Sequence, residues 1–284
     1  MAISSSDNRV AVVTGSSSGI GYETSMMLAR NGFLTYATMR NLNKGENIKS
    51  NAGKENLPVR ITQLDVTDEL SINNAVQAIL SETGRLDVLV NNAGYVLEGA
   101  FEHLSMDELK GQYETNVFGL IRTTQAVLPT MRNQKSGIIV NISSAAGRFG
   151  YPAGSAYVST KFAVEGLSES MSYELEPYGI KVVVVEPGVI RTNIFNSAVI
   201  AKKSQDPNSP YSQIMQKMAT GFEEMLKNAS SSADLVAKVV LSAVTNENSN
   251  IRYLAGKDVE TWLDSKRNMS DEEFYKMMKQ NLMR

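Results

Sequence analysis

Short, continuous apolar runs alternate with longer segments of helical periodicity along most of this chain, and this alternation constrains the fold strongly. A continuous apolar run of four to eight residues is typical of a parallel strand that is buried on both faces. Strands that alternate with helices form one sheet through right-handed crossovers. We therefore predict an α/β fold with a doubly wound, mostly parallel seven-stranded sheet and helices on both faces. The runs lie at 9–14, 33–38, 59–64, 86–90, 137–142, 180–185 and 251–254.

A turn rich in glycine and serine follows the first run and opens an amphipathic segment that ends near Asn31. Glycines let a backbone approach a pyrophosphate, and the unpaired amides and the dipole at a helix start favour negative charge. A turn of this kind can also serve packing alone. We interpret it as a site for a dinucleotide cofactor, with contacts from Gly15, Ser17, Ser18, Gly19, Ile20 and Gly21.

The same turn also matches the Gly-x-Ser-x-Gly pattern of hydrolase nucleophiles. A hydrolase triad would need a histidine, and the chain has one, His103. That residue stands at an expected loop-to-helix junction, where we interpret it as an ordinary surface residue. We therefore reject a hydrolase.

Composition excludes several kinds of chemistry. The chain has no cysteine, which excludes thiolate nucleophiles and cysteine-ligated metals, and we predict no metal site. The net charge of −2 argues against nucleic acid as a partner. No signal segment and no run of about eighteen apolar residues occurs, so we expect a cytoplasmic protein that does not interact with membranes.

Polar residues follow the next three runs, where parallel strands present ligands. Arg40 follows the second run at the place where an acidic residue would bind the ribose of NAD, and a guanidinium there favours the 2′-phosphate of NADP, although an exposed arginine at a loop start is an alternative. Asp65, followed by Val66, could accept from the adenine amino group or cap the helix expected over 68–83. After the fourth run, Asn91 and Asn92 could tie strands together or contact the cofactor, beside Ala93 and Gly94.

Tyr157 and Lys161 are four residues apart on one face of an expected helix. A nearby cation favours the phenolate form of tyrosine, so Lys161 could lower the pKa of Tyr157. Ser144 ends a strand, where its hydroxyl could donate to a substrate oxygen. Asn116 is a polar residue among apolar ones, and it either satisfies a backbone distortion or anchors a water that relays protons to Lys161.

Taken together, these motifs resemble those of the short-chain dehydrogenase/reductases, in their compact single-domain branch. The matching residues are Thr14, Gly15, Gly19, Gly21, Asn91 to Gly94, Asn116, Ser144, Tyr157, Lys161, Pro187 and Gly188. The resemblance implies that Tyr157 is the catalytic acid/base, that Lys161 lowers the pKa of Tyr157 and holds the nicotinamide ribose, that Ser144 polarises the carbonyl and that Asn116 completes a proton relay. It also implies that Pro187, Gly188, Val189, Ile190 and Thr192 contact the nicotinamide end.

The expected reaction is hydride transfer between NADP(H) and the carbonyl or alcohol carbon of a substrate, with Tyr157 moving the proton. Arg40 and Ser18 resemble the pattern in NADP-preferring members such as steroid and retinol reductases. A sensor or partner module of the same fold that binds NADP without turnover stays open as an alternative. A sugar-nucleotide epimerase or dehydratase is a further alternative, but such enzymes usually space their glycines differently.

Beyond 192 the sequence is less informative. We interpret 1–284 as one domain with a methionine-rich substrate lid over about 193–227 and a C-terminal extension over about 257–284 that could cover the pocket or a subunit face. An uncharged neighbourhood predicts a small-molecule, fairly apolar substrate, although Arg148 could serve an anionic group. The residues behind that prediction are Val96, Leu97, Ala146, Phe149 and Tyr151. The resemblance also implies a homodimer or homotetramer that pairs through the helices beginning near Ser105 and Ala156.

Overall fold

The computed structural model describes residues 9–191, 198–228, 231–246 and 250–283. Its centre is a seven-stranded sheet in the order β11-β7-β6-β4-β1-β2-β3, and every neighbouring pair is parallel. The predicted doubly wound sheet is therefore confirmed. The strands are β1 (Val10–Val13), β2 (Leu34–Met39), β3 (Val59–Gln63), β4 (Val88–Asn91), β6 (Gly137–Ile142), β7 (Ile180–Pro187) and β11 (Arg252–Ala255).

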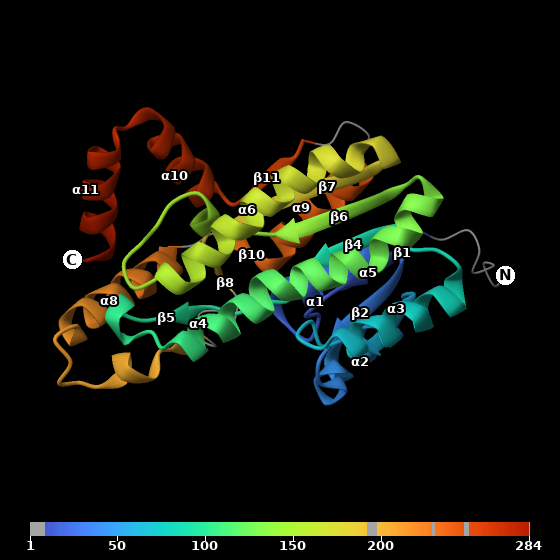
Figure 1. Cartoon of the computed structure of the whole chain (residues 1–284), viewed down its shortest axis with the longest axis horizontal. Helices are drawn as coiled ribbons and strands as arrows, with labels where there is room; N and C mark the ends of the chain where they lie inside the picture. The colour runs from blue at the N-terminus through green and yellow to red at the C-terminus, as the bar shows by residue number, and fades with distance from the viewer. Residues whose placement is uncertain (1–8, 192–197, 229–230, 247–249, 284) are drawn as a thin grey trace.

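Helices cover both faces of this sheet because successive residues of a strand point to opposite faces. Val10 and Val12 of β1 pack into a core cluster that includes residues of α3 (Glu69–Thr83) and α5 (Gly119–Gln134). Ala11 and Val13 pack into a second cluster on the other face, with α1 (Gly19–Arg30) and α9 (Ala233–Thr245). Figure 1 shows α3, α5 and α6 (Ser155–Leu175) on one side of the strands. The continuous apolar runs thus reflect burial from two sides.

The strand order reverses between β1 and β4, since β2 and β3 lie on one side of β1 while β4 and the later strands lie on the other. Open α/β sheets bind ligands in the crevice that such a reversal creates at the carboxyl ends of the strands. β1 and β4 are in register through Val12 and Leu89. The Gly-rich turn after β1 and the Asn91–Gly94 segment after β4 therefore come together at one edge.

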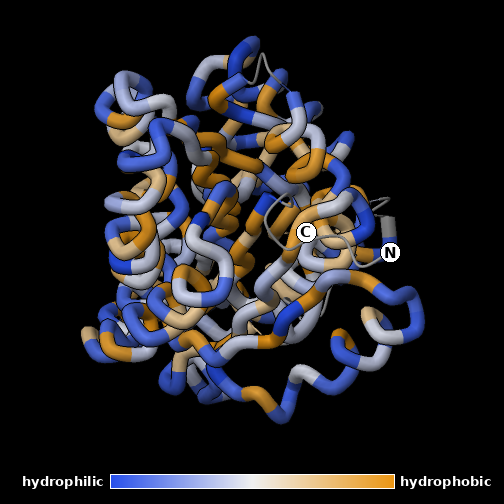
Figure 2. Tube along the Cα trace, turned by 90° about the vertical axis from the view of Figure 1, so that its right-hand side faces the viewer, coloured by the Kyte–Doolittle hydropathy of each residue, from blue (hydrophilic) through white to orange (hydrophobic). Residues whose placement is uncertain are grey.

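Smaller elements gather at this carboxyl edge. Figure 1 places α8, α10 and α11 at the left end of the molecule, away from the N-terminal end of the described chain. In Figure 2 the outer turns are mostly hydrophilic. The remaining elements are η1 (Leu42–Gly45), α2 (Glu46–Lys54), β5 (Leu97–Glu98), η2 (Phe101–His103), α4 (Met106–Tyr113), the π-helix η3 (Glu114–Phe118), η4 (Ala145–Gly147), η5 (Glu176–Tyr178), β8 (Ile190–Arg191), β9 (Val199–Ile200), η6 (Lys202–Gln205), α8 (Ser212–Asn228), β10 (Ser231–Ser232), α10 (Lys257–Asn268) and α11 (Asp271–Leu282).

Side-chain caps fix where several helices begin. Ser105 forms a reciprocal capping box with Glu108 at the start of α4, as the sequence indicates. Asp68 caps α3 by accepting from the amides of Leu70 and Ser71. The alternative in which Asp65 caps this helix is therefore wrong, because Asp65 instead accepts from the amide and hydroxyl of Thr67.

Within the described ranges, no helix combines the length and the apolar character that a membrane crossing requires.

Candidate active site

One apolar cavity lies at the carboxyl edge of the sheet and contains Ser144, Tyr157 and Lys161 in its wall. Its empty volume is about 900 Å³, part of which is open to solvent. The cofactor-side segments and the C-terminal helices contribute to the same wall. The lining residues are Ile20, Asn92, Gly94, Tyr95, Val96, Ile142 to Ala146, Phe149, Tyr151, Tyr157, Lys161, Pro187 to Ile190, Phe222, Met225, Trp262, Met278 and Leu282.

Tyr157 lies in the first turn of α6 and is 9% exposed. Burial raises the pKa of its phenol to about 12, and a hydrogen bond with Ser144 opposes that rise. The ammonium of Lys161 is 5.5 Å from the centroid of the Tyr157 ring. Desolvation thus has the largest effect on the phenol in this arrangement, rather than the lowering of the pKa that we expected from Lys161.

Lys161 is held by the neighbouring strand. Its Nζ donates to the main-chain oxygen of Ile142 at 2.8 Å, and 8% of the residue is exposed. Burial lowers the pKa of this ammonium to about 8, and the nearby charge of Glu165 raises it. An ammonium carries three donors, and Ile142 takes one of them. Two donors of Lys161 therefore remain for a ligand in the cavity.

Ser144 stands where β6 gives way to η4, and its hydroxyl oxygen accepts from the amide of Ala146 at 3.1 Å. This acceptor role leaves the hydroxyl hydrogen for Tyr157 or for a substrate oxygen. Ser143 also lines the cavity, but it is 2% exposed and its hydroxyl has no hydrogen-bond partner in the described residues. The hydrogen bond to Tyr157 distinguishes Ser144 from its neighbour.

Asn116 lies inside the π-helix η3, so the backbone distortion that the sequence suggested is present. Its side-chain oxygen accepts from the amide of Tyr95 at 3.1 Å. Its side-chain nitrogen donates to the oxygen of Tyr95 at 2.9 Å and to the hydroxyl of Thr160 at 3.3 Å. The amide of Asn116 thus fastens the segment after β4 to α6, and a proton relay through this residue stays a prediction.

The Gly-rich turn has the shape that a pyrophosphate requires. Gly15 and Gly19 have φ values of 70° and 59°, which favour glycine. A Cβ on Gly21 would lie 2.4 Å from the oxygen of Gly15. Ser18 is the N-cap of α1, and its side chain makes no capping hydrogen bond, so the first amides of this 12-residue helix are available to an anion. These residues fit a dinucleotide.

Asn91 and Asn92 both tie segments together. Two amides after β4, those of Asn92 and Ala93, donate to the hydroxyl of Thr14 at 3.0 Å each, and the side chain of Asn92 donates to the oxygens of Thr14 and Gly15. Asn91 donates to Thr124 and Asn141, both at 2.9 Å. The structural role is therefore present for both residues. Asn92 also lines the cavity, whereas Asn91 does not.

A hollow lies at the other end of the Gly-rich turn. The residues that line it are Ser17, Ser18, Asn43, Lys44, Glu46 and Asn47. Arg40 is exposed at the end of β2, and its guanidinium has no partner among the described residues. Lys44 was missed in the sequence, although a second cation four residues after Arg40 was a usable signal. Serine hydroxyls and cations near one another suit a phosphate.

The other predicted cofactor contacts lie along the same edge. Asp65 and Val66 follow β3, and Val66 packs against Gly119, where a Cβ would approach it to 2.8 Å. Ala93 and Gly94 follow β4, and Gly94 lies against the side chain of Asn116. Thr192 lies outside the described residues.

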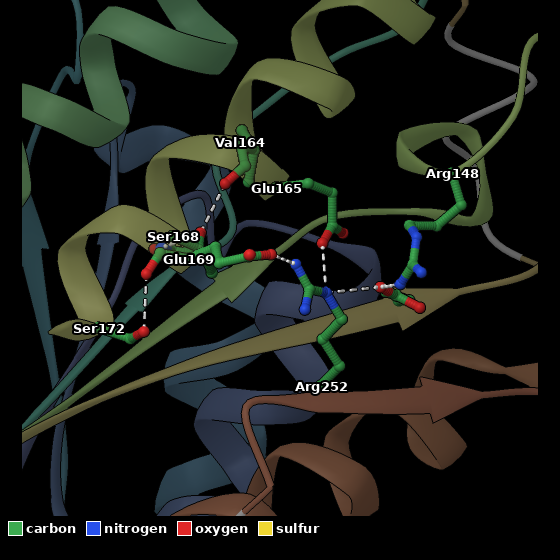
Figure 3. Close-up of polar contacts among 9 residues, drawn as sticks. Arg148, Val164, Glu165, Ser168, Glu169, Ser172 and Arg252 are labelled. Atoms are coloured by element: carbon green, nitrogen blue, oxygen red, sulfur yellow. Dashed lines mark hydrogen bonds and ion pairs between the residues drawn. The ribbon is translucent and has the colours of Figure 1, made fainter.

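A network of ion pairs around the buried carboxylates of Glu165 and Glu186 lies outside the cavity lining. Glu186, which is 0% exposed, pairs with Arg148 at 2.8 Å, and Arg148 does not line the cavity. A role of Arg148 toward an anionic group stays a prediction. Arg252 contacts Glu165 at 3.0 Å and Glu169 at 2.5 Å. Figure 3 shows its guanidinium between these carboxylates, with Arg148 facing it. Burial raises the pKa of Glu186, as does the charge of Glu165, while Arg148 lowers it.

The substrate end of the cavity is mainly apolar. Of the neighbourhood predicted from sequence, Val96, Ala146, Phe149 and Tyr151 line the cavity, but Leu97 packs elsewhere. Of the two alternatives for the C-terminal extension, the pocket or a subunit face, the structure shows that three of its residues line the cavity. These residues are Trp262, Met278 and Leu282.

His103 is half-buried, not an ordinary surface residue. Its two ring nitrogens lie 3.1 Å from the hydroxyl of Ser204 and 3.2 Å from that of Ser209. Its ring also meets Tyr211 edge-on at a centroid distance of 5.0 Å. The histidine thus joins η2 to the segment that leads into α8.

The parallel sheet, its reversal between β1 and β4 and the Gly-rich turn define a dinucleotide-binding α/β protein. Residues 9–203 match the family model for short chain dehydrogenases, and this chain belongs to that family.

Curated relatives agree with this assignment. The chain is 38% identical over 263 residues to the uncharacterized oxidoreductase YusZ of Bacillus subtilis, covering 90% of this chain and 92% of the relative. It is 42% identical over 194 residues to a 3-ketodihydrosphingosine reductase of Bacteroides thetaiotaomicron, covering 68% of each. Over 246 residues it is 34% identical to retinol dehydrogenase 8 of Bos taurus, covering 83% of this chain and 78% of the relative. The chain is accordingly an oxidoreductase of this family.

Solved structures are similar as well. A short-chain dehydrogenase from Streptomyces avermitilis shares 33% identity with a TM-score of 0.79, covering 96% of this chain and 97% of that one. A metagenomic short-chain oxidoreductase in complex with NADP shares 26% identity with a TM-score of 0.70, covering 88% of this chain and 98% of that one.

Proposed function

We propose that this chain is an NADP(H)-dependent oxidoreductase that interconverts a carbonyl group and an alcohol on a largely apolar substrate, with Tyr157 as the acid/base. One observation carries the proposal. Ser144, Tyr157 and Lys161 share the wall of a single apolar cavity that also reaches the Gly-rich turn through Ile20.

The protein's own groups have distinct roles in this proposal. The phenol of Tyr157 gives its proton to the carbonyl oxygen during reduction and takes it back during oxidation. Ser144, whose oxygen already accepts from Ala146, donates to the same substrate oxygen and stabilises charge as it develops. Lys161 holds a ribose through its remaining donors, while the hydrogen bond with Ser144 opposes the rise in the pKa of Tyr157 that burial causes. When bound, the nicotinamide supplies the hydride or accepts it.

The preference for NADP is supported by the hollow beside the Gly-rich turn. Ser17, Ser18 and Lys44 line it together with one carboxylate, Glu46. Arg40 is exposed at the end of β2, three residues before Asn43 of the lining, without a partner for its guanidinium among the described residues. No carboxylate occupies the end of β2, where it would repel a 2′-phosphate. The solved relative that contains NADP is consistent with this preference.

An apolar substrate is supported by the aromatic and methionine side chains around the far end of the cavity, which include Phe149, Met225 and Trp262. Two relatives are named for a retinol and for a ketosphingoid base, both of which carry long apolar chains. Methionines in α8 adapt to apolar ligands of varied shape.

Fluorescence titration with NADPH and NADH, followed by absorbance assays with a panel of apolar ketones and aldehydes, tests the proposal. We expect tighter binding of NADPH and substrate-dependent oxidation that disappears in Tyr157→Phe. Binding without turnover on any substrate would favour a sensor of the same fold. Failure to bind either cofactor would overturn the proposal.

A further inference from the structure

A carboxylate of the C-terminal extension contacts the loop that is proposed to hold the nicotinamide. Asp258, in the first turn of α10, accepts a hydrogen bond from the amide of Val189 through Oδ2 at 2.6 Å. The two residues are 69 positions apart in the chain. Val189 lines the cavity, whereas Asp258 is not among the lining residues. Asp258 therefore acts on the cavity through the loop rather than by touching a ligand.

Two glycines make room for this carboxylate. A Cβ on Gly188 would lie 2.3 Å from Oδ2 of Asp258, and a Cβ on Gly256 would lie 2.5 Å from Oδ1. Gly256 also has a φ of 135°, which L side chains rarely adopt. The amide of Gly188 donates to the main-chain oxygen of Ala255 at 3.2 Å, so a backbone hydrogen bond also joins the loop to the segment before α10. The contact requires small residues on both sides of the carboxylate. Asp258 therefore does more than interact with the helix dipole at the start of α10.

The part of the extension that follows Asp258 in the chain forms part of the apolar wall of the cavity. Trp262 follows in α10, and Met278 and Leu282 belong to α11. Phe149, from the segment after η4, meets the Trp262 ring at a centroid distance of 5.8 Å and the Phe274 ring at 5.3 Å. These aromatic contacts hold the extension over the cavity, and the Asp258 contact fixes the end nearest the cofactor loop.

We propose that Asp258 is a positioning residue that couples the loop Gly188–Ile190 to the extension, so that binding of the nicotinamide end and ordering of the apolar substrate wall occur together. This inference rests on the proposed function. It predicts that a cofactor that contacts this loop, and not the extension, protects α10 and α11 from solvent exchange. A purely local role for Asp258, as an acidic residue at the start of α10, predicts no such transmission.

Hydrogen exchange on the full chain, with and without NADPH, tests the coupling. In the wild-type protein we expect NADPH to slow exchange in peptides from α10 and α11. In Asp258→Ala that protection should be lost, unliganded exchange should rise in both the loop and the extension, and the dissociation constant for NADPH should rise at least five-fold. Asp258→Asn keeps an oxygen that can accept from Val189, and it should restore most of the transmitted protection.

Asp264→Asn is the matched control, because Asp264 lies on the same helix, is 70% exposed at its side chain and forms an ion pair with Arg267 of the same helix. It should behave like the wild-type protein. Peptides from β1 and β4 serve as an internal reference, since a general loss of stability would raise their exchange too.

A double-mutant cycle with Gly188→Ala separates the contact from other effects. In the wild-type background, the added methyl group should raise hydrogen exchange in the C-terminal extension. In Asp258→Ala the carboxylate is absent, so the same methyl group should raise this exchange much less. Additive effects would overturn the proposal, as would unchanged NADPH protection of α10 and α11 in Asp258→Ala. If the wild-type protein binds no nicotinamide cofactor, the proposed function fails, while the cycle in the unliganded protein still decides whether Asp258 joins the two segments.

Discussion

The ammonium of Lys161 donates to the main-chain oxygen of Ile142, the last residue of β6, at 2.8 Å. This bond joins α6 to the strand that ends just before Ser144. It fixes the spacing between the phenol of Tyr157 on the helix and the hydroxyl of Ser144 beyond the strand.

The buried ammonium predicts an alkaline limit to activity. Burial lowers the pKa of Lys161 to about 8, so the charged form is lost as the pH rises through that value. We expect kcat/KM for carbonyl reduction to fall over that range. Glu165 raises the pKa of Lys161, and Glu165→Gln should therefore move the fall to lower pH. A pH profile from 6 to 10 measures both effects, and an alkaline limb that is identical in the variant would contradict this account.

Replacement of the phenol should separate chemistry from binding. In Tyr157→Phe we expect kcat to fall by about 10²–10⁴-fold or more, because the positioned proton donor is lost. The dissociation constant for NADPH should change by less than about three-fold. Tyr178→Phe, at a half-exposed position in η5, is the control and should keep full activity. Steady-state kinetics together with fluorescence titration give both quantities.

The two cations after β2 should determine cofactor preference. Arg40→Ala is expected to weaken NADPH binding roughly ten-fold, because a charge-assisted contact with the 2′-phosphate is removed. Lys44→Ala should act in the same direction, and NADH binding should stay nearly constant in both variants. Arg132→Ala removes an exposed cation at the far end of α5 and controls for net charge. Equal losses for NADPH and NADH would argue against a phosphate contact.

The close packing of Gly21 against Gly15 in the Gly-rich turn predicts that a larger residue at position 21 lowers the stability of the fold. In Gly21→Ala the new Cβ would lie 2.4 Å from the oxygen of Gly15 and 2.5 Å from the Asn92 side chain. Overpacking of this kind typically destabilises by about 1–3 kcal/mol. Gly53→Ala, in α2, meets nothing within 4 Å and should stabilise the fold by about 0.5–1 kcal/mol. Urea denaturation of the two variants should therefore give changes of opposite sign.

Glu98 in β5 predicts a pH-dependent stability. Burial raises its pKa from 4.5 to about 7, so the folded state binds a proton that the unfolded state has released. The resulting stabilisation is fully present below about pH 4.5 and is lost as the pH rises through about 7; it amounts to at most roughly 3 kcal/mol. Glu98→Gln should remove this part of the pH dependence.

Urea denaturation of the wild-type protein and of Glu98→Gln at pH 5 and pH 8 measures that effect. Glu260→Gln, at an exposed position of α10, is the control and should follow the wild-type protein. If the free energy of unfolding changes with pH by the same amount in the wild-type protein and in Glu98→Gln, the burial argument is refuted.

Much of the fold could be predicted because its determinants are local. Continuous apolar runs marked the strands, and the capping box at Ser105 marked the start of α4. The spacing from Tyr157 to Lys161 placed both side chains in one cavity wall, since that spacing is a property of the helix itself. The observed strand ends differ from the predicted ones by a residue or two, because pairing with neighbouring strands decides where a strand stops.

The remaining features depend on contacts between distant segments. The bond between Asp258 and Val189 spans 69 positions, and the contacts of His103 with Ser204 and Ser209 span more than 100. The sequence offers Asp65 as a helix cap, but Asp68 takes that role because it stands directly before the first helical residue. Sequence patterns do not contain such pairings. The sequence therefore suggests that the extension could cover the pocket, but only the folded structure shows which of its residues form the wall.

The short pairing of β8 with β10 has a consequence for how this protein could be diversified. Ile190 and Ser231 are register partners, so the chain leaves and rejoins the core one strand spacing apart, about 5 Å. Doubling the length of a loop closed in this way costs only about 0.6 kcal/mol. Insertions in the stretch between them should therefore be tolerated, provided that the chain keeps the bond from Val199 to Val96 that pairs β9 with β5, the contacts of Ser204 and Ser209 with His103, and the cavity residues Phe222 and Met225.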